Sequence, residues 1–433
     1  MKPNKLKLVE NYFSRNLDCN LSFEENPHIG LCVSGGPDSM ALVVLMNNWI
    51  KKNNGKITIF HFNHGLRKES EIESKFVKKF SNNLGYECKI IKWQDSKPKS
   101  GIMKTARNLR YKKIIEECKK KKILHLMTAH HHDDSLETFF MRSLRKKTYE
   151  GLFSIPFRRI HESLQIIRPL INFKKIKLKE ICKFYNIDWI SDSSNFNFFY
   201  ERPRIRERLS NFSGKKLNFL AKELKKNKID NENVEKKITD FFISNLRHNQ
   251  NGSFEIGKTK LLKIKQNIQI EILRRILRTC SSKIYLPCLN STKLILEKLK
   301  KYKISKLTLH SCLIVLKNDK ILIYRESKAT QKKMNKGLVV DIKNSNFWDN
   351  RFKIYSDKYE LHCELITERN WVELKNNFYN GNNIPFDIIK TLPLIRFNKK
   401  KVIPFLISNE ELEKASIDFY FSPKIPLTKK NFF

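Results

Sequence analysis

The sequence predicts an α/β protein whose N-terminal half is a parallel β-sheet with helices on both faces. Short apolar, β-rich runs alternate there with segments of helical spacing, which is the pattern of strand–helix–strand units. A Ser-Gly-Gly-Pro-Asp-Ser loop at 34–39 joins the first such run to a long apolar segment. The sequence becomes rich in Lys and Asn near 211–216, and this change separates the first half from a helical middle and a β-rich end.

The expected elements of the first half follow from these runs. The strands are expected at 29–33, 57–62, 87–93 and 123–129. The helices are expected at 40–49, 71–84 and 105–118. Ligands of such sheets bind beyond the carboxyl ends of the strands. The loops at 34–39, 63–67 and 130–137 should therefore converge on one crevice.

The later part of the chain is mostly helical up to about residue 267 and then carries shorter elements. Amphipathic helices are expected at 268–278 and 291–299, a hairpin between 306–316 and 320–324, and a polar linker at 329–336. Short strands are expected at 352–355, 361–366, 392–397 and 402–406. We therefore expect domains at 1–212, 213–329 and 330–433.

The charge of the chain points to a nucleic-acid partner. Its 433 residues include 86 Lys and Arg but only 44 Asp and Glu, a net charge of +42. Phosphate neutralisation by such side chains dominates nucleic-acid binding. Compositional drift explains the preference for Lys over Arg but not the shortage of acids, and a membrane surface is a weaker alternative. Nine scattered cysteines, no signal peptide and no apolar run long enough to span a membrane indicate a cytoplasmic protein.

The loop at 34–39 has the properties of a phosphate site. It lies between a strand and a helix N-terminus, whose N–H groups and partial positive charge suit an anion. Gly35 and Gly36 allow a bend and a close approach, Ser34 and Ser39 add hydroxyl donors, and Asp38 suits Mg²⁺. The Gly-Lys-Ser/Thr ending of a P-loop is absent. The alternative is an ordinary turn between a core strand and a helix.

Two further segments carry polar groups with open interpretations. His61 to Arg67, including Asn63, ends a strand and could contact a base or ribose, or form a loop with two exposed histidines. Arg107 and Arg110 share a helix face and could grip phosphate oxygens, or form a solvated basic face.

The acidic segment from Thr128 to Thr138 follows a buried strand. Its three adjacent histidines do not aim at one tetrahedral centre, so a transition-metal site is disfavoured. Asp133 or Asp134 could hold Mg²⁺, with Glu137 one turn on, and a carboxylate there could bind an amine. The alternative is an acidic helix cap. Further on, Arg202, Arg204 and Arg206 form a dense basic group that could bind phosphate or be a solvated surface.

Together these segments resemble the tRNA(Ile)-lysidine synthetases, a family within the pyrophosphate-loop (PP-loop) ATP pyrophosphatases. The match keeps its order and approximate spacing across 29–209. It is carried by Ser34 to Ser39, His61 to Arg67, Ala106 to Tyr111, Thr128 to Thr138, Arg168 to Leu170, and Asp192 to Arg206. The resemblance implies a Rossmann-like PP-loop catalytic domain, a helical middle domain and a small β-rich C-terminal domain, the last two binding tRNA.

The resemblance implies an ATP-dependent reaction on a minor isoleucine tRNA with a CAU anticodon. The wobble cytidine attacks ATP through its ring carbonyl oxygen, pyrophosphate leaves, and the ε-amine of L-lysine then displaces AMP to give lysidine. A homodimer is possible. The alternatives are a PP-loop tRNA thiolase, which usually needs spaced cysteines that this chain lacks, and a tRNA-binding protein that has lost catalysis.

The resemblance also implies roles for single residues. Catalytic roles fall to Asp38, Arg107, Arg110, Asp133, Asp134 and Glu137. ATP would be bound by Ser34, Gly35, Gly36, Pro37, Asp38, Ser39, Asn63 and Arg110. Asp133 or Glu137 would bind the lysine amine, Asp38 and Asp134 would hold Mg²⁺, and tRNA would be contacted by Arg202, Arg204 and Arg206.

Overall fold

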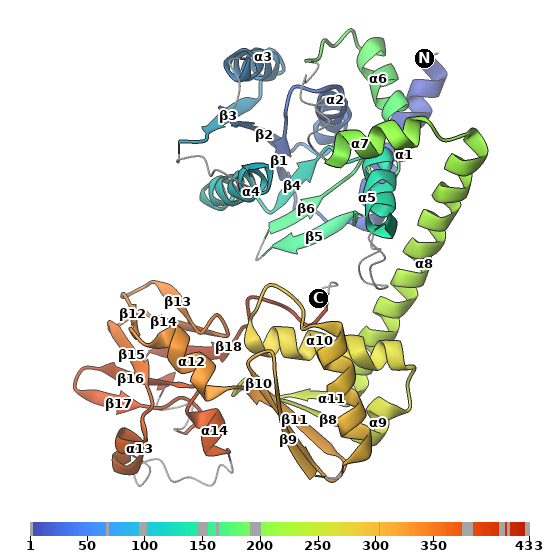
Figure 1. The fold of residues 1–433 in the computed structure, drawn as a ribbon. Helices are drawn as coiled ribbons and strands as arrows, with labels where there is room; N and C mark the ends of the chain where they lie inside the picture. Colours follow the sequence, from blue (N-terminus) through green and yellow to red (C-terminus); the bar gives the residue numbers. More distant parts are fainter. Residues whose placement is uncertain are drawn as a thin grey trace. The chain divides into compact units, whose positions relative to one another are not determined.

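The chain forms two compact units, Met1–Asn231 and Glu232–Phe433 (Figure 1). The structure is a computed structural model that describes residues 3–65, 69–94, 102–144, 155–161, 164–190, 201–302, 304–374, 384–406, 412–413 and 416–428. Helix α8, Gly214–Asn245, runs from one unit into the other. The domain boundaries at 212/213 and 329/330 stay a prediction.

The first unit is built on a six-stranded sheet with the order β3-β2-β1-β4-β6-β5. Its strands are β1 His28–Cys32, β2 Lys56–Asn63, β3 Glu87–Lys92, β4 His125–Thr128, β5 Arg158–His161 and β6 Leu164–Ile167. All neighbours pair in parallel except β5 and β6, which are antiparallel. The predicted parallel sheet is confirmed, and β5 and β6 are additions that the sequence analysis did not anticipate.

Two separate cores confirm that helices cover both faces of this sheet. The helices are α1 Pro3–Asn20, α2 Pro37–Lys52, α3 Ser70–Asn83, α4 Ile102–Lys120, α5 His132–Leu144, α6 Lys175–Phe184 and α7 Glu201–Ser210. Ile57 and Ile59 of β2 pack in one core with α1, α2, α3 and α6. Phe60 and Phe62 pack on the other face with α4. Alternate residues of a strand point to opposite faces, so β2 contributes to both cores.

Helix α1 was missed by the sequence analysis, which found no apolar core near the N-terminus. Its buried residues are Leu6, Phe13 and Leu17, spaced among Lys, Asn and Glu. This spacing of seven and four residues places them on one side of a helix. The segment has few apolar residues, and polar residues fill the turns between them. It therefore did not look like a helix that packs against a core.

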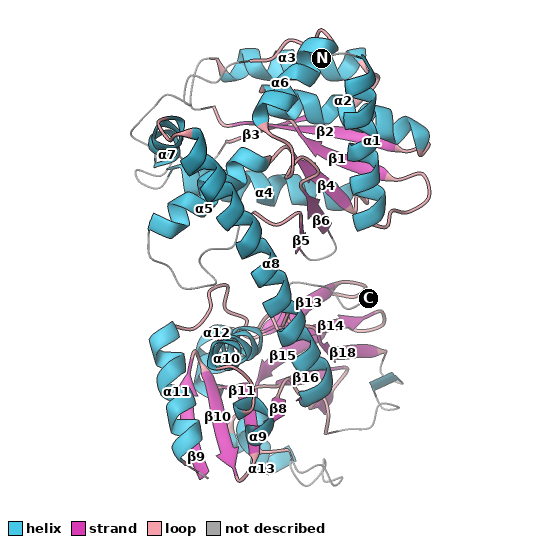
Figure 2. Cartoon of the chain, turned by 90° about the vertical axis from the view of Figure 1, so that its right-hand side faces the viewer, coloured by secondary structure: helices cyan, strands magenta, loops and turns pink. Residues whose placement is uncertain are grey.

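The second unit begins with helices, as expected, but these cover a five-stranded antiparallel sheet (Figure 2). The helices are α9 Lys258–Leu262, α10 Gln266–Ser281 and α11 Leu289–Lys301. The strands are β7 Leu246–His248, β8 Phe254–Gly257, β9 Ile304–Leu309, β10 Cys312–Lys317 and β11 Lys320–Arg325, in the order β7-β8-β11-β10-β9. The helical middle region is confirmed, and β7 and β8 lie inside the segment that was expected to be mostly helical.

The hairpin around Asn318 is confirmed. The prediction that its first arm, 306–316, is one strand is wrong. β10 and β11 pair in antiparallel fashion across Asn318, whose φ is 53°. The run 306–316 breaks at His310 and Ser311, whose φ angles are 56° and 59°. Two consecutive left-handed residues form a tight turn that reverses the chain, so β9 and β10 pair with each other.

The C-terminal part is β-rich, as predicted, and contains two small sheets. One has the order β12-β15-β16-β17 and the other β13-β14-β18. Their strands are β12 Leu338–Val340, β13 Ser345–Trp348, β14 Phe352–Ser356, β15 Leu361–Leu365, β16 Pro393–Phe397, β17 Lys400–Val402 and β18 Ile417–Phe421; the short helices are α13 Glu368–Leu374 and α14 Phe386–Ile389.

Two expectations for this part were wrong. The segment 329–336 is not a linker but belongs to helix α12, Ser327–Met334, because Thr330 and Met334 lie four residues apart and are both buried. The strand expected at 402–406 is instead β17, which ends at Val402. Its pairing with β16 stops there, at the pair of Val402 with Ile395.

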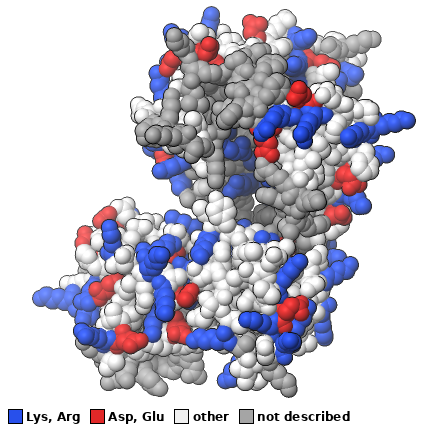
Figure 3. All heavy atoms as spheres, in the orientation of Figure 1, with Lys and Arg blue, Asp and Glu red and all other residues white. Residues whose placement is uncertain are grey.

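Basic side chains are spread over both units, and acidic side chains are fewer on the face drawn in Figure 3. None of the helices in the described ranges has the length and apolar character that a membrane span requires. All nine cysteines lie in described residues and are unpaired.

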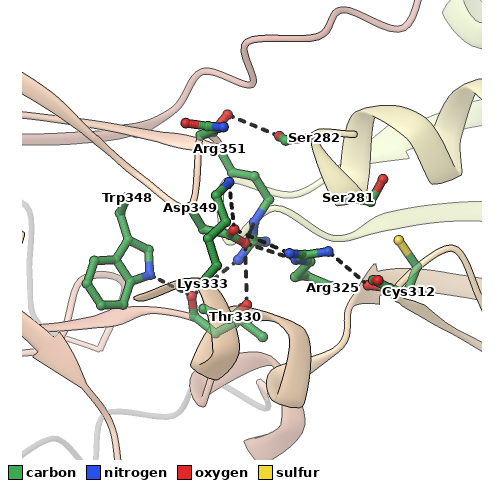
Figure 4. Close-up of polar contacts among 12 residues, drawn as sticks. Ser281, Ser282, Cys312, Arg325, Thr330, Lys333, Trp348, Asp349 and Arg351 are labelled. Carbon is green, nitrogen blue, oxygen red and sulfur yellow. Dashed lines mark hydrogen bonds and ion pairs between the residues drawn. The ribbon is translucent and has the colours of Figure 1, made fainter. Parts of the chain in front are cut away.

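A buried aspartate joins the five-stranded sheet to the C-terminal part of the second unit (Figure 4). Asp349 is 0% exposed. Its Oδ2 accepts hydrogen bonds from the Nε atoms of Arg325 and Arg351, both at 2.9 Å, and its Oδ1 lies 3.1 Å from Lys333 Nζ. Burial raises the pKa of Asp349, but the charges of Arg351, Arg325 and Lys333 outweigh it and hold the pKa below its usual value.

We expect Asp349→Asn to destabilise the second unit by about 3–5 kcal/mol, because it leaves buried guanidinium groups without a counter-charge. Chemical denaturation followed by tryptophan fluorescence measures this, since Trp348 is buried beside the cluster. The control is Asp341→Asn, which removes an exposed carboxylate and should change stability by less than about 0.5 kcal/mol. A similar small change in both variants would contradict the role given to Asp349.

Candidate active site

The loop at 34–39 and the acidic segment leave the first sheet side by side. β1 and β4 are parallel neighbours, and Cys32 pairs with Thr128 at their carboxyl ends. The chain after Cys32 forms the glycine loop and enters α2, and the chain after Thr128 enters α5. Helix α7 packs on α5 (Figure 1). The expected convergence of these two loops at one edge of the sheet is therefore present.

The conformation of the loop depends on Gly35. Its φ is +88°, a backbone conformation that side chains rarely adopt, and an added Cβ would lie 3.3 Å from Val77 Cγ2. Gly36 also lies in the bend, as expected, but with φ −76° and ψ 161°, a conformation that other residues can adopt. Gly36 is the N-cap of α2 and has no side chain to cap the helix, and an added Cβ would make only ordinary contacts, the nearest at 3.7 Å to Ser34 Oγ. Pro37 has no N–H and the N–H of Ser39 donates to Gly36 O at 3.0 Å, so among the first three residues of α2 the N–H of Asp38 is the one left for an anion.

Side chains around the loop hold it in place. Ser39 Oγ donates to Gly36 O at 2.9 Å and accepts from Ser34 N at 3.2 Å. His61 Nδ1 lies 2.9 Å from Val33 O, and His61 is buried rather than exposed. The hydroxyl of Ser39 therefore braces the turn.

His131 lies between the aspartate of the loop and the acidic segment. Its Nε2 is 3.5 Å from Asp38 Oδ2 and 3.5 Å from Asp134 Oδ2. Burial lowers the pKa of His131, but the hydrogen bond to Asp38 and the charges of Asp134, Asp38 and Asp133 outweigh it, and the pKa is raised. Asp134 Oδ2 also accepts the His131 N–H at 3.1 Å, which fixes the start of α5.

Glu137 forms an ion pair with Arg206 next to these residues. Arg206 Nε donates to Glu137 Oε1 at 2.7 Å, and Arg206 Nη2 lies 3.8 Å from Asp134 Oδ1. Glu137 is 5% exposed, and burial raises its pKa despite the hydrogen bond from Arg206. Arg206 therefore faces the crevice from α7.

Asp133 has different partners from Asp134. Its Oδ2 accepts the N–H of Lys175, the first residue of α6, at 2.9 Å, and its Oδ1 lies 3.2 Å from His132 Nδ1. Burial raises the pKa of Asp133, but the hydrogen bonds from His132 and Lys175 outweigh it and lower the pKa. Asp133 therefore caps the neighbouring helix α6. The alternative interpretation of this segment as an acidic cap of the helix that follows it is not what Asp133 does.

Two carboxylate oxygens in the crevice have no hydrogen-bond partner among the described residues. They are Asp38 Oδ1 and Glu137 Oε2, and both are buried. No three His, Cys, Asp or Glu side chains within the described ranges group closely enough to hold a metal ion by themselves. Mg²⁺ commonly takes one or two carboxylates together with substrate phosphates and waters. Asp38, with Asp134 close by, fits that donor set.

Arg107 and Arg110 come together on the ring of Tyr111, with guanidinium carbons 5.5 and 5.4 Å from its centroid. The three arginines of α7 do not form one patch. Arg202 and Arg206 lie four residues apart on one side of the helix, and Arg204 is exposed on another side.

Asn63 supports the chain that follows β2. Its Nδ2 donates to Ser74 Oγ at 3.0 Å and to Ser70 O at 3.3 Å, and its Oδ1 accepts the Gly65 N–H at 2.8 Å. The side chain is buried and shapes the turn. Contact with ATP stays a prediction for this residue.

Several residues of the expected motifs lie outside the described residues. They are Leu66 and Arg67 of the second motif, 145–148 after α5, and Asp192 with the rest of 191–200. Conversely, the sequence analysis gave no role to His61 or His131. Both histidines lie in the segments 61–67 and 128–138 that carry the family resemblance. Nothing in the sequence, however, distinguishes His131, which contacts Asp38, from His130 and His132.

The thiols near the crevice are poor nucleophiles. Burial raises the pKa of Cys32 to about 11, although Arg110 is nearby. Burial and the charge of Asp38 raise the pKa of Cys182 to about 11, and its Sγ donates to Pro37 O. Thiolate chemistry at the loop is therefore disfavoured at neutral pH.

We expect His130 to contribute to acid destabilisation of the first unit. Burial, together with the charges of Arg168, Arg107 and Arg202, lowers its pKa from 6.5 to about 3, against the opposing charge of Asp134. The unfolded chain then binds the proton more readily, so stability falls as pH drops below 6.5, by up to about 1.4 kcal/mol per pH unit.

His130→Gln should flatten the pH dependence of urea unfolding between pH 7 and pH 5. The matched control is His161→Gln, which changes an exposed histidine of β5. An unchanged slope in the His130 variant would show that His130 does not carry this effect.

The comparisons with known proteins agree with this geometry. The PP-loop domain family matches residues 8–212. A tRNA(Ile)-lysidine synthase of Orientia tsutsugamushi is 28% identical over 441 residues, which cover 96% of this chain and 98% of that protein. A tRNA(Ile)-lysidine synthase of Rickettsia bellii is 30% identical over 91% of this chain and 93% of its own length.

A tRNA(Ile)-lysidine synthase of Wolbachia pipientis is 31% identical over 77% of this chain and 78% of its own length. These similarities extend well beyond the PP-loop domain into the helical and β-rich parts of the second unit. A glycine loop and an acidic segment at one edge of a parallel sheet, joined to a second unit that the relatives share, lead to one assignment: the chain belongs to the tRNA(Ile)-lysidine synthase family.

Proposed function

We propose that this protein forms lysidine on an isoleucine tRNA at the expense of ATP. The ring carbonyl oxygen of the wobble cytidine in a CAU anticodon attacks the α-phosphorus of ATP, and the bond to pyrophosphate breaks. The ε-amine of L-lysine, after losing a proton to solvent, then attacks the activated ring carbon; a C–N bond forms, and the C–O bond to the phosphate breaks to release AMP. The observation that carries this proposal is similarity to lysidine synthases over almost the whole chain, combined with a bent glycine loop beside Asp38, His131 and Asp134.

The loop would bind the phosphates of ATP. The uncapped N-terminus of α2 offers the N–H of Asp38 and partial positive charge to the departing pyrophosphate. Such a fixed donor needs no reorganisation as negative charge develops, which favours the transition state. Arg107 and Arg110, held together on Tyr111, would add positive charge on the phosphates.

Asp38 and Asp134 would hold Mg²⁺. The buried, unpartnered Oδ1 of Asp38 is the atom that supports this assignment. Bound Mg²⁺ supplies charge that offsets the phosphates of ATP. His131, whose Nε2 lies 3.5 Å from a carboxylate oxygen of each aspartate, would hold the two carboxylates in position.

Glu137 is the better candidate for the lysine amine. Its Oε2 is buried and has no hydrogen-bond partner among the described residues, whereas both oxygens of Asp133 are engaged. Arg206 holds the other oxygen of Glu137 in place, so we assign Arg206 to the site and leave Arg202 and Arg204 as tRNA contacts. A cationic amine facing a buried carboxylate oxygen would gain a charge-assisted hydrogen bond.

The net charge of +42 suits a tRNA partner. A cytoplasmic location belongs to this proposal and rests on the sequence, and a homodimer belongs to it only through the family resemblance. Cys32 and Cys182, as protonated thiols, weigh against the thiolase alternative.

The test of the proposed function combines purified protein, ATP, Mg²⁺, labelled lysine and tRNA(Ile) with a CAU anticodon. We expect label in the tRNA and one pyrophosphate released per lysine incorporated. Transfer of sulfur from a sulfur donor would identify a thiolase. Tight tRNA binding with neither product would identify a binding protein without catalysis.

We expect Asp38→Asn to lower the rate of pyrophosphate release by at least about 100-fold, since a carboxylate that orients charge at the phosphates is lost. Affinity for tRNA should stay within about twofold, because Asp38 lies in the nucleotide part of the site.

Glu25→Gln is the matched control, since it removes an exposed carboxylate in the loop before β1, at the opposite end of that strand. It should leave both quantities unchanged. A parallel loss of tRNA affinity in Asp38→Asn would mean that Asp38 is structural.

A further inference from the structure

We propose that Arg168 and Arg159, together with Arg107 and Arg202, form a second phosphate-binding subsite beside the PP-loop. The inference rests on the proposed function and extends it, because neither Arg168 nor Arg159 has a role there. The ligand is a phosphate group, which could belong to ATP or to the RNA backbone next to the target cytidine. We call these four residues the arginine subsite.

The order of the strands places this subsite next to the loop. β6 lies beside β4, which lies beside β1. Arg168 directly follows β6 at its carboxyl end, and Arg159 on β5 is paired with Ile166 of β6. Two strand spacings of about 4.8 Å separate the ends of β1 and β6, so the subsite is roughly 10 Å from the loop. It is therefore adjacent to the PP-loop site and shares Arg107 with it.

Arg168 is a buried cation with an unused donor. Its residue is 5% exposed, and its Nη1 donates to Pro156 O at 2.9 Å. Its Nε is buried and has no hydrogen-bond partner among the described residues. A buried charged donor without an acceptor is costly, and such groups in native proteins call for an explanation. A bound anion would supply the missing acceptor.

The arginines near Arg168 repel one another. Arg107 feels the charges of Arg110, Arg202 and Arg159, and these add to burial in lowering its pKa. Burial and the charges of Arg107 and Arg159 lower the pKa of Arg168. Tyr111 acts in the opposite direction and raises the pKa of both Arg107 and Arg168. None of the four arginines forms an ion pair with a carboxylate in the described part of the chain.

The other buried arginines of this protein each have a carboxylate. Arg275 is paired with Glu235, and Arg325 and Arg351 are paired with Asp349. In the same crevice, Arg206 is paired with Glu137. Arg168 therefore differs from these buried arginines in lacking a carboxylate partner among the described residues, while Arg107 and Arg159 are exposed. A buried guanidinium without its own counter-charge is the property of a site that takes its anion from a ligand.

His130 interacts with both groups of charges. It feels the charge of Asp134 as well as those of Arg168, Arg107 and Arg202, while the next residue, His131, contacts Asp38 and Asp134. The neutral ring of His130 adds no charge to the arginines. The carboxyl edge of the sheet is thus divided into an acidic zone above β1 and β4 and a cationic zone above β4 and β6.

The test compares Arg159→Gln with Arg158→Gln. Arg159 and Arg158 are adjacent, exposed residues of β5, so their side chains point to opposite faces of the strand. We expect Arg159→Gln to raise one Michaelis constant about 5–10-fold and Arg158→Gln to raise neither. A higher KM for ATP at saturating tRNA would identify a phosphate of ATP, and a higher KM for tRNA at saturating ATP would identify an RNA phosphate.

Arg168→Lys is the second variant, since it keeps the charge and removes the planar guanidinium. We expect it to change the same Michaelis constant as Arg159→Gln, with a melting temperature close to that of the unaltered protein. If Arg159→Gln and a folded Arg168→Lys both keep the KM values of Arg158→Gln, the arginine subsite does not bind phosphate and the inference is overturned.

A readout without catalysis separates this inference from the proposed function. The melting temperature of each protein is measured with increasing inorganic pyrophosphate. If the unaltered protein makes no lysidine, the proposed function fails. The subsite is then judged by whether pyrophosphate stabilises Arg159→Gln less than Arg158→Gln, and equal stabilisation would overturn it.

Discussion

The parallel pairing of β1 with β4 is the constraint on which the site depends. It brings Cys32 opposite Thr128, and so places the glycine loop and the acidic segment at one edge of the sheet. His131 then lies 3.5 Å from Asp38 and from Asp134, residues that are about 100 positions apart in the chain. Antiparallel pairing would have sent the two segments to opposite ends of the sheet.

Charge is divided along this edge rather than mixed. Above β1 and β4 the carboxylates of Asp38, Asp134 and Glu137 face one histidine and one arginine. Above β6 the guanidinium groups of Arg168 and its neighbours face each other. A nucleotide needs both environments, because its phosphates attract cations while Mg²⁺ and an amine attract carboxylates. The division therefore suits an enzyme that handles phosphates and a cationic amine in the same crevice.

In the second unit, a single acidic residue performs the opposite task. Asp349 forms ion pairs with Arg325 of β11, Lys333 of α12 and Arg351. It thereby connects the five-stranded sheet to α12 and to the C-terminal part of the unit. Removing the charges of Arg325 and Arg351 from water is possible because both find the same carboxylate, to which the exposed Lys333 is also paired. The basic composition thus has a structural cost, which is offset at this point by one buried acid.

The sequence by itself determined the order of strands and helices from β1 to β4, the loop at 34–39, and the acidic segment with Asp134 and Glu137, because period and local residue type specify these features. It could not show α1 or α12, whose few apolar residues matter only against their partners. The sequence pattern predicted one strand at 306–316, because the left-handed turn at His310 and Ser311 contains no glycine that would indicate it.

Only the tertiary structure decided which of the candidate side chains meet. Asp133 and Asp134 are adjacent in sequence, yet one caps α6 and the other contacts His131. Likewise Arg206 and Arg204 are two residues apart, and only Arg206 reaches Glu137. Neighbouring residues of a helix point in directions about 100° apart, so their partners are set by the elements packed around them, and that packing is a property of the whole fold.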